Sequence, residues 1–430
     1  MSNIKLPFHS INLFAKQFIT NTVLAVLLAI SLEGWTQTRF YDPIFGVGVK
    51  YTIEYGKTTI PLDKVTSLTL DFYAPENDIL RKRPLIILMH GGGYLMGNKN
   101  NYPMETLCSR FAQMGYACAS INYSLKFEKK GTPNDRAGKK VLQTTQELKA
   151  AIRFFRASVD NGNKFQIDAN QIWVGGSSSG GITALHTAFV QEKDFDRFSW
   201  KLNDFGGLEG LGGNPNYSSK VQGVISLSGA IGDTAYIKSN IPVVSVHGVF
   251  DPIVPYEIGQ IAFDFPFFGD VPPADVIGSK TIHEYLDKKG IRNDLLSLNN
   301  QGHVPFDKML EWHHYPIYMD RTINHVRNFL YNEINQTWNT ALEKKDTKTE
   351  HTNSISYERL KDKGGWYFYP VDKNIQKIKL FVYDQNGKKI KKLKIRKKRK
   401  SFYWKGMDLP GKFKLNAIYN GYRMDWDIGE

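Results

Sequence analysis

Cysteine is scarce in this sequence, since only Cys108 and Cys118 occur among 430 residues. The chain is 41% hydrophobic, which is enough for a sizeable core without many cross-links. Cys108 lies on an expected helix and Cys118 on the strand that follows it, so packing of the helix on that strand can bring them together. Two interpretations stay open, a disulfide between Cys108 and Cys118 or a pair of buried free thiols. A nucleophilic cysteine is not indicated.

Long apolar runs are also lacking. Near the N-terminus the run VLAVLLAISL has 10 residues, whereas a membrane-spanning helix needs about 20. Lys5 and Lys16 precede it, no acidic residue comes before Glu33, and the polar stretch EGWTQT follows. This order is typical of a cleaved export signal, so we expect residues 1–37 to be a signal peptide, with an uncleaved anchor as the alternative. The protein is then expected to be secreted, at the cell surface or in the periplasm.

Acidic residues are the minority charge, and their deficit is confined to one end of the chain. The net charge is +14. Residues 341–430 hold 23 Lys and Arg against 11 Asp and Glu, which leaves 33 against 31 for the first 340 residues. The run KKIKKLKIRKKRK contains ten basic residues in thirteen. A solvated basic face is the default interpretation, attraction of an anionic polymer by charge is the alternative, and nucleic-acid binding is not expected.

Residues 38–340 alternate short apolar strands with helical stretches. PLIILMH, YACASINY, QIWVGG, VQGVISLSG and IPVVSVHG read as strands, whereas VLQTTQELKAAIRFFRASV and GITALHTAFVQ have helical spacing. Such alternation is typical of an α/β fold with a mostly parallel sheet and helices on both faces. Residues 341–355 are polar and read as a linker. Residues 356–430 carry closely spaced strands with a hairpin signal at QNGK, so we expect a small antiparallel β-sandwich.

The stretch IWVGGSSSGG places Gly176-Ser177-Ser178-Ser179-Gly180 between an expected strand and an expected helix. This is the G-x-S-x-G pattern of a nucleophile elbow, in which a tight turn exposes the central hydroxyl. The flanking positions must lack side chains, or the helix and the sheet would collide. Ser178 is therefore the candidate nucleophile, although the pattern alone is weak because Gly and Ser are common in turns.

A glycine-rich loop strengthens that interpretation. The sequence MHGGGYLMG directly follows an expected buried strand and resembles the HGGG element of lipases and esterases. The resemblance implies that the amides of Gly92 and Gly93, with that of Ser179, stabilise an oxyanion. His90 is then a loop-ordering residue. A phosphate-binding loop is the rival interpretation, but the loop lacks the Lys-Ser/Thr ending.

A serine nucleophile needs a base, and the base needs an orienting carboxylate. Asp251 lies four residues beyond His247, which ends an expected strand, and His303 follows the strand LLSLNN. The chain order Ser178, Asp251, His303 is the one expected for an α/β-hydrolase. The rival bases are worse placed along the chain, and His247 is interpreted as a structural strand cap; the others are His186, His283, His313 and His314.

Residues about 45 to 335 resemble the secreted carboxylesterase branch of the α/β-hydrolase family, close to bacterial acetyl or feruloyl esterases that act on carbohydrates. The motifs HGGGY, INYSL, GGSSSGG, HGVFDPIVP and GHVPF carry the resemblance. Ser177 and Ser179 depart from the usual G-D/E-S-A-G-G elbow, and Ser124 stands where an arginine is usual. The last 75 residues resemble, more weakly, the C-terminal sorting domain of type IX-secreted proteins, through KLFVYDQNGKKI and LPGKFKLNAIYNG.

The expected function is therefore that of a serine carboxylesterase working through an acyl-enzyme, with acetyl or feruloyl groups of polysaccharides as substrates. No cofactor and no metal are implied, because the serine and the oxyanion donors suffice for this chemistry. The expected partners are the ester, small or polysaccharide-linked, and a secretion machinery that engages the C-terminal domain. The alternatives are a serine peptidase of the prolyl-oligopeptidase kind and a catalytically silent adhesion module.

Overall fold

In the computed structural model, the described residues are 38–48, 50–58, 66–261, 271–308 and 315–335, together with the backbone of residues 336–342 and of seven strands between 357 and 428. The expected signal peptide, nearly all of the expected linker, and His313 and His314 lie outside the described residues. None of the helices in the described ranges is long and apolar enough to cross a lipid bilayer.

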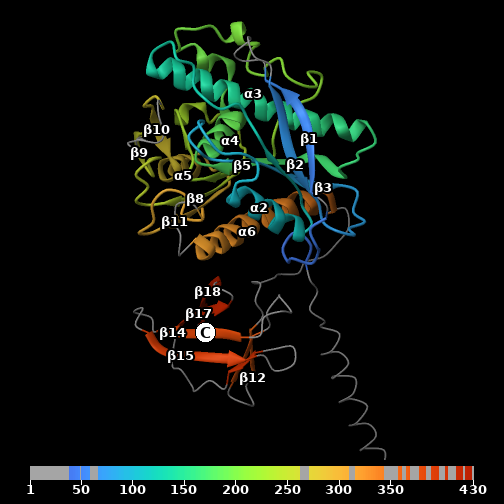
Figure 1. The fold of residues 1–430 in the computed structure, drawn as a ribbon, viewed down its shortest axis with the longest axis vertical. Helices are drawn as coiled ribbons and strands as arrows, with labels where there is room; N and C mark the ends of the chain where they lie inside the picture. The colour runs from blue at the N-terminus through green and yellow to red at the C-terminus, as the bar shows by residue number, and fades with distance from the viewer. Residues whose placement is uncertain are drawn as a thin grey trace, which may run out of the picture.

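An eight-stranded sheet forms the centre of the molecule (Figure 1), with the order β1-β2-β4-β3-β5-β6-β8-β11. The first two pairs in this order are antiparallel, and all the others are parallel. The strands are β1 (Tyr51–Lys57), β2 (Ser67–Tyr73), β3 (Arg83–Met89), β4 (Ala117–Ile121), β5 (Ile167–Ser177), β6 (Gly223–Leu227), β8 (Val243–Gly248) and β11 (Asn293–Leu298).

Helices cover both faces of this sheet. They are α2 (Tyr102–Gln113), α3 (Pro133–Asp160), α4 (Ser179–Phe189), α5 (Ser279–Lys288) and α6 (Tyr315–Leu342). Figure 1 shows α3 on one side of the strands and α2 with α6 on the other. The prediction of a mostly parallel sheet between two helical layers is confirmed.

The central strand β3 explains why its sequence is a continuous apolar run. Successive side chains of a strand point to opposite faces of the sheet. Leu85 and Ile87 therefore join the core beneath α3 and α4, whereas Ile86 and Leu88 join the core beneath α2 and α6. Every residue of β3 is buried, and such a strand cannot alternate apolar with polar residues.

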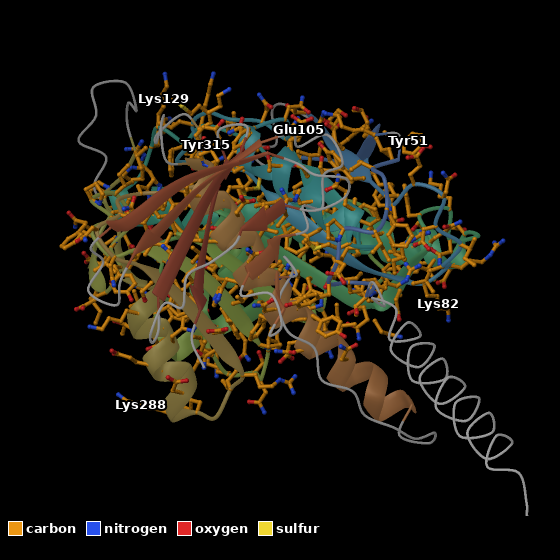
Figure 2. All side chains as sticks on the ribbon, turned by 90° about the horizontal axis from the view of Figure 1, so that it is seen from below. Tyr51, Lys82, Glu105, Lys129, Lys288 and Tyr315 are labelled. Carbon is orange, nitrogen blue, oxygen red and sulfur yellow. The ribbon has the colours of Figure 1, made fainter. Side chains whose placement is uncertain are left out.

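Charged side chains gather at the outer surface of the molecule. Figure 2 shows the labelled side chains of Lys82, Glu105, Lys129 and Lys288 pointing outward, and all four residues are exposed.

The region after α4 departs from the alternation of strands and helices. Three short 3-10 turns lie here, η1 (Glu192–Phe195), η2 (Leu202–Phe205) and η3 (Thr234–Tyr236). The rings of Phe198 and Trp200 stack with their centroids 5.1 Å apart. A separate three-stranded sheet joins β7 (Ala230–Ile231), β10 (Asp275–Gly278) and β9 (Ile258–Gln260). Phe195 of η1, Tyr236 of η3 and Val276 of β10 line the same cavity as Ser178, the residue directly after β5.

The C-terminal region forms two antiparallel sheets. One joins β12 (Tyr357–Leu360), β13 (Gly365–Phe368) and β16 (Phe402–Trp404), and the other has the order β15 (Lys389–Arg396), β14 (Lys377–Tyr383), β17 (Phe413–Tyr419), β18 (Tyr422–Ile428). Strands β14 and β15 flank the QNGK turn signal and pair in antiparallel register. Packing of the two sheets as a sandwich, and a sorting role, stay predictions.

The two cysteines are buried free thiols. Cys108 lies on α2 and Cys118 on β4, as expected, and both are 0% exposed. Burial raises the pKa of Cys118, and a hydrogen bond with Cys108 adds to this effect. The interpretation as a disulfide is therefore corrected in favour of two neighbouring thiols that fill an apolar space between the helix and the sheet.

Candidate active site

Ser178 occupies a sharp turn between β5 and α4. Its backbone angles are φ 53° and ψ −121°, in a region that a non-glycine residue adopts only at a cost of about 1–3 kcal/mol. The glycines on either side make the turn feasible. A Cβ on Gly176 or Gly180 would lie 2.4 or 2.3 Å from the carbonyl oxygen of Met89. Any side chain there would push the helix away from β3, so the spacing of these glycines is a packing requirement.

The structure brings Ser178, His303 and Asp251 together at the carboxyl end of the sheet. The Oγ of Ser178 lies 2.9 Å from Nε2 of His303, and Nδ1 of His303 lies 2.6 Å from Oδ2 of Asp251. Since Asp251 accepts a hydrogen bond, Nδ1 of His303 carries the proton. In the neutral ring, Nε2 is then free to accept the hydroxyl proton of Ser178. This is the arrangement that activates a serine.

Asp251 follows β8 and is surrounded by donors. Its Oδ1 accepts hydrogen bonds from the amides of Ile253 and Val254, each 2.9 Å long. Burial alone would raise the pKa of this carboxyl, but the hydrogen bonds from His247 and His303 outweigh it and hold the pKa of Asp251 well below its usual range. The carboxylate therefore remains ionised beside His303.

His247 is a functional neighbour that sequence reasoning missed. Its Nε2 lies 3.2 Å from Oδ2 of Asp251 and 3.1 Å from the carbonyl oxygen of Val254. Both partners accept, so Nε2 carries a proton, and Nδ1 lies 2.8 Å from Oγ of Ser279. The interpretation of His247 as a strand cap was incomplete, because its ring shares one carboxylate oxygen with His303. The H-x-x-x-D spacing in HGVFD was the available signal.

The loop that carries His303 is held by packing. Val304 has φ 48°, a value that β-branched residues rarely adopt, yet its side chain is only 3% exposed within the core beneath α6. A Cβ on Gly248 would lie 2.0 Å from the carbonyl oxygen of Gly302. The end of β8 and the loop of His303 thus touch through backbone atoms, which fixes the distance between Asp251 and His303.

The glycine-rich loop lies directly against the elbow. A Cβ on Gly91 would be 3.2 Å from Cβ of Ser178. Gly92 and Gly93 have φ of 110° and 62°, which turns this backbone in a way that favours glycine. Within the described part of the chain, neither of their amides donates to a backbone carbonyl. Gly93 lines the same cavity as Ser178 and Ser179, so the predicted oxyanion donors lie near the nucleophile.

Tyr123 connects this loop to the elbow, and it was not found from the sequence. Its hydroxyl donates to the carbonyl oxygen of His90 at 2.9 Å and lies 3.1 Å from Oγ of Ser179. Its ring stacks on that of His90 with centroids 4.3 Å apart. Burial lowers the pKa of His90 to about 4, so this ring is neutral, and His90 orders the loop through contacts with Tyr123 and Gly91.

Ser124, the residue after Tyr123, is held by a buried carboxylate. The amide and the Oγ of Ser124 lie 2.8 and 2.5 Å from the two carboxylate oxygens of Glu147. Nζ of Lys140 donates to the carbonyl oxygen of Ser124 at 3.2 Å. Burial lowers the pKa of Lys140 to about 8 and raises the pKa of Glu147. Ser124 thus lies between the carboxylate of Glu147 and the ammonium group of Lys140.

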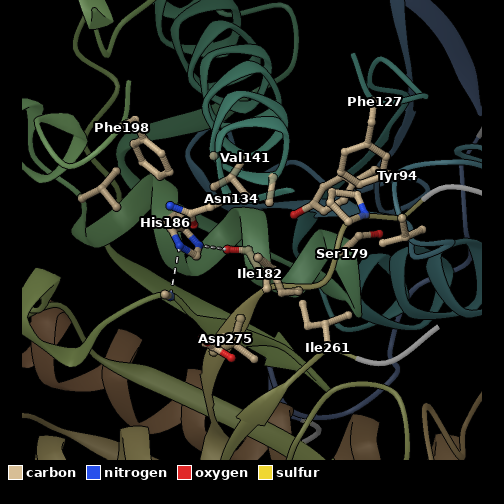
Figure 3. A pocket seen from close by; sticks show the side chains of 18 of the residues that line it. Tyr94, Phe127, Asn134, Val141, Ser179, Ile182, His186, Phe198, Ile261 and Asp275 are labelled. Atoms are coloured by element: carbon tan, nitrogen blue, oxygen red, sulfur yellow. Dashed lines mark hydrogen bonds between the residues drawn. The ribbon is translucent and has the colours of Figure 1, made fainter. Parts of the chain in front are cut away.

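A cavity of about 100 Å³ opens beside Ser178. Figure 3 shows Tyr94 and Phe127 at one side of it, His186 and Phe198 at the other, and Ile261 below Ser179. Most of its lining is apolar and comes from α3, α4, the segment after α4, and the β9–β10 sheet. Apolar lining residues include Val141 of α3, Ile182 of α4 and Phe198 of the segment after α4.

The rival histidines in the described residues have other partners. Nδ1 of His186 lies 2.8 Å from the carbonyl oxygen of Ile182, and Nε2 accepts from the amide of Gly232. His283 contacts Ser245 and Asn293 through its two ring nitrogens. Burial lowers the pKa of each of these histidines to about 4. Neither ring reaches Ser178.

Three comparisons bear on this site. Residues 70–232, which include the glycine-rich loop and the elbow, match the family model described as BD-FAE. Gut esterase 1 of Caenorhabditis elegans is 29% identical over 116 residues, which is 26% of this chain and 19% of that protein. The chain thus spans about a fifth of the length of this curated relative. The BD-FAE match supports the prediction of an esterase-like α/β-hydrolase.

Solved structures of esterase 2 from Thermogutta terrifontis are also similar. The apo form is 18% identical, covers 66% of this chain and 94% of that chain, and has a TM-score of 0.46. The propionate-bound form is 18% identical, covers 66% and 93%, and has a TM-score of 0.44.

Proposed function

We propose that this chain is a serine carboxylesterase in which Ser178, His303 and Asp251 form the catalytic triad. The observation that carries the proposal is the unbroken hydrogen-bonded line from Oγ of Ser178 through His303 to Asp251. It begins at a residue whose strained backbone presents the hydroxyl to a cavity. The BD-FAE match and the name of the nematode relative agree with ester hydrolysis.

The geometry accounts for each step of such a reaction. Oγ of Ser178 attacks the ester carbonyl carbon while Nε2 of His303 takes the hydroxyl proton. The amides of Gly92, Gly93 and Ser179 stabilise the resulting oxyanion, and one such donor contributes about 3–4 kcal/mol. Asp251 stabilises the imidazolium. The ester C–O bond then breaks, His303 gives its proton to the leaving alcohol, and a water molecule, activated in the same way, hydrolyses the acyl-enzyme.

We further propose that the ester is an acyl group, acetyl or feruloyl, on a polysaccharide outside the cytoplasm. The support is the resemblance to secreted carbohydrate esterases, the signal-like N-terminus and the apolar cavity beside Ser178.

In the same proposal, the C-terminal strands engage a secretion machinery. A pulse-chase of tagged protein in its native host tests this part, because deletion of residues 356–430 is expected to hold the enzyme back in the cell.

Hydrolysis of p-nitrophenyl acetate tests the catalytic proposal. The wild-type enzyme is expected to release nitrophenol, and Ser178→Ala to lose on the order of 10⁴–10⁶-fold in kcat. Ser177→Ala is the matched control, because it removes a buried hydroxyl one residue away that takes no part in the triad. Activity that survives in Ser178→Ala would reject Ser178 as the nucleophile. A dipeptidyl chromogenic amide tests the peptidase alternative, and a fully inactive wild type would favour the adhesion module.

A further inference from the structure

Helix α5 packs against β8, the strand that precedes Asp251 (Figure 1), and two hydrogen-bonded pairs of serine and histidine join these elements. His247 of β8 pairs with Ser279 of α5, with Nδ1 2.8 Å from Oγ. Ser245 of β8 pairs with His283 of α5, with Oγ 2.8 Å from Nε2. Residues two apart on a strand and four apart on a helix share a face. The two pairs therefore lie next to each other, with the serine and the histidine exchanged between strand and helix.

The partners of His247 determine the direction of its hydrogen bonds. Its Nε2 carries the proton, because Oδ2 of Asp251 and the carbonyl oxygen of Val254 both accept. In the neutral ring Nδ1 is then an acceptor, and the hydroxyl of Ser279 donates to it. The other acceptor near this hydroxyl, the carbonyl oxygen of Gly229, lies 3.5 Å away, which is longer than an ordinary hydrogen bond. The bond from Ser279 to His247 is therefore the stronger one.

Asp251 thus lies at the centre of a symmetric line of hydrogen bonds. On each side a histidine donates to Oδ2 and a serine donates to that histidine, with His303 and Ser178 on one side and His247 and Ser279 on the other. Ser279 is not a second nucleophile, because it is 0% exposed. A hydroxyl that donates to one nitrogen of an imidazole polarises the ring and strengthens the bond donated by the other nitrogen. Ser279 therefore affects how far His247 neutralises Asp251.

Tyr256 is a further titratable neighbour of His247. Its ring meets the ring of His247 edge-on, with centroids 5.6 Å apart. Its hydroxyl lies 2.5 Å from Oγ of Ser297, so this group has a partner of its own on β11. Tyr256 thus does not replace Ser279 as the donor to Nδ1 of the histidine.

The second serine–histidine pair has the same chemistry but a different end. Ser245 and His283 are 1% and 4% exposed. Nδ1 of His283 lies 2.5 Å from Oδ1 of Asn293, so the line from Ser245 leads to an amide of β11. In the described part of the chain, the hydrogen bonds of Asp251 go to two histidines and two backbone amides, and neither histidine is His283. This pair is therefore a control at the same interface.

We propose that Ser279 is a positioning residue of the triad, which acts on His303 through His247 and Asp251. The inference rests on the proposed function. By donating to Nδ1, Ser279 holds the ring of His247 with its Nε2 proton on Asp251. Without this hydroxyl, His247 donates more weakly, and Asp251 carries more uncompensated negative charge. That charge stabilises the imidazolium of His303, so the base of the triad becomes neutral only at a higher pH.

The pH dependence of kcat/KM for p-nitrophenyl acetate, measured on the full chain, tests this role. Ser279→Ala is expected to move the acid limb upward by about 0.3 of a pH unit, which is less than in His247→Leu because the histidine remains. Ser279→Cys fills the same space with a weak donor and is expected to shift the limb in the same direction. Ser245→Ala is the matched control. It removes a buried hydroxyl from the same interface and is expected to leave the acid limb in place.

Nitrogen NMR of isotope-labelled histidine rings tests the same role without a substrate. In the wild type, we expect Nε2 of His247 to be protonated and Nδ1 to accept a hydrogen bond. Ser279→Ala is expected to shift the Nδ1 signal of His247 to that of an acceptor without a donor, and to move the Nδ1–H signal of His303 as well. Ser245→Ala is expected to move the signals of His283 and to leave those of His303 unchanged.

The outcomes separate this inference from the proposed function. A wild type that hydrolyses no ester overturns the proposed function, whereas the NMR comparison still tests the role of Ser279. An unmoved acid limb or unmoved signals of His303 in a folded Ser279 variant overturn that role. Equal shifts in Ser279→Ala and Ser245→Ala also overturn it, because lost packing then explains both.

A double variant tests the route by which Ser279 acts. If the effect passes through His247, adding Ser279→Ala to His247→Leu moves the acid limb no further than His247→Leu alone. A further upward shift in the double variant would mean that Ser279 acts on the triad by another route, and would overturn the inference.

Discussion

His247 competes with His303 for one oxygen of Asp251, and this competition predicts a change in the pH profile. His247→Leu removes the 3.2 Å contact to Oδ2, which leaves that oxygen to His303 alone. Hydrogen bonds to charged groups contribute about 1.5–3 kcal/mol, and the length of this one favours the lower end. One pH unit corresponds to about 1.4 kcal/mol, so the acid limb of the pH–rate profile is expected to shift by at most about one unit.

The direction in which the pH–rate profile shifts follows from the role of His303. A less shared Asp251 carries more uncompensated negative charge, which stabilises the imidazolium of His303. Catalysis needs the neutral ring, and the acid limb of the profile of kcat/KM is therefore expected to move upward. The assay is hydrolysis of p-nitrophenyl acetate between pH 4 and 9.

His247→Gln is the matched variant, because its side-chain amide can still donate to Asp251. It is expected to keep the acid limb close to that of the wild type, even though both variants lose stability through the contact with Ser279. An unmoved acid limb in His247→Leu, with thermal unfolding that shows a folded protein, would refute the reasoning.

Other predictions follow from the elbow, from the loop and from buried histidines. Gly180→Ala places a Cβ 2.3 Å from the backbone of Met89 and is expected to lower kcat/KM for p-nitrophenyl acetate at least about 100-fold. Gly56→Ala is the control and is expected to leave kcat/KM unchanged, because its Cβ would lie 4.0 Å from Cβ of Ala150. Tyr123→Phe frees the loop from the elbow and is expected to lower kcat about tenfold with KM unchanged in steady-state kinetics; a change in KM alone would contradict the linking role. His90, His186 and His283 have pKa values of about 4 against about 6.5 in an unfolded chain. The unfolded state therefore binds more protons between pH 6.5 and 4, so urea denaturation is expected to show stability falling by several kcal/mol across that window, and a constant stability there would argue against buried neutral rings.

The main features of the fold could be predicted from the sequence because its strands are buried on both faces. A run such as PLIILM has to serve two cores, and the structure places its residues alternately in them. The triad residues could also be predicted from the sequence, for a related reason. Ser178, Asp251 and His303 each follow a strand, and carboxyl ends of parallel strands meet at one edge of the sheet.

The supporting contacts of the site could not be predicted, because they depend on strand order. Tyr123 follows β4, and only the placement of β4 beside β3 brings it to His90. Lys140 approaches Ser124 from α3, a helix whose position over the sheet no local pattern gives. The link from His247 to Asp251 requires the bend after β8. Whether Cys108 and Cys118 form a disulfide could not be predicted either, because their spacing in the sequence is the same for two neighbouring thiols and for a disulfide.

The central claim is that the acyl group passes through Oγ of Ser178, and trapping the intermediate tests it most directly. The enzyme is mixed with excess p-nitrophenyl butyrate, quenched in acid within a turnover, and measured by intact and peptide mass spectrometry. We expect the wild type to gain the mass of one acyl group on the peptide that contains Ser178, and Ser178→Ala to gain none. Acylation of another residue during normal turnover, or turnover by Ser178→Ala at the wild-type rate, would contradict the account.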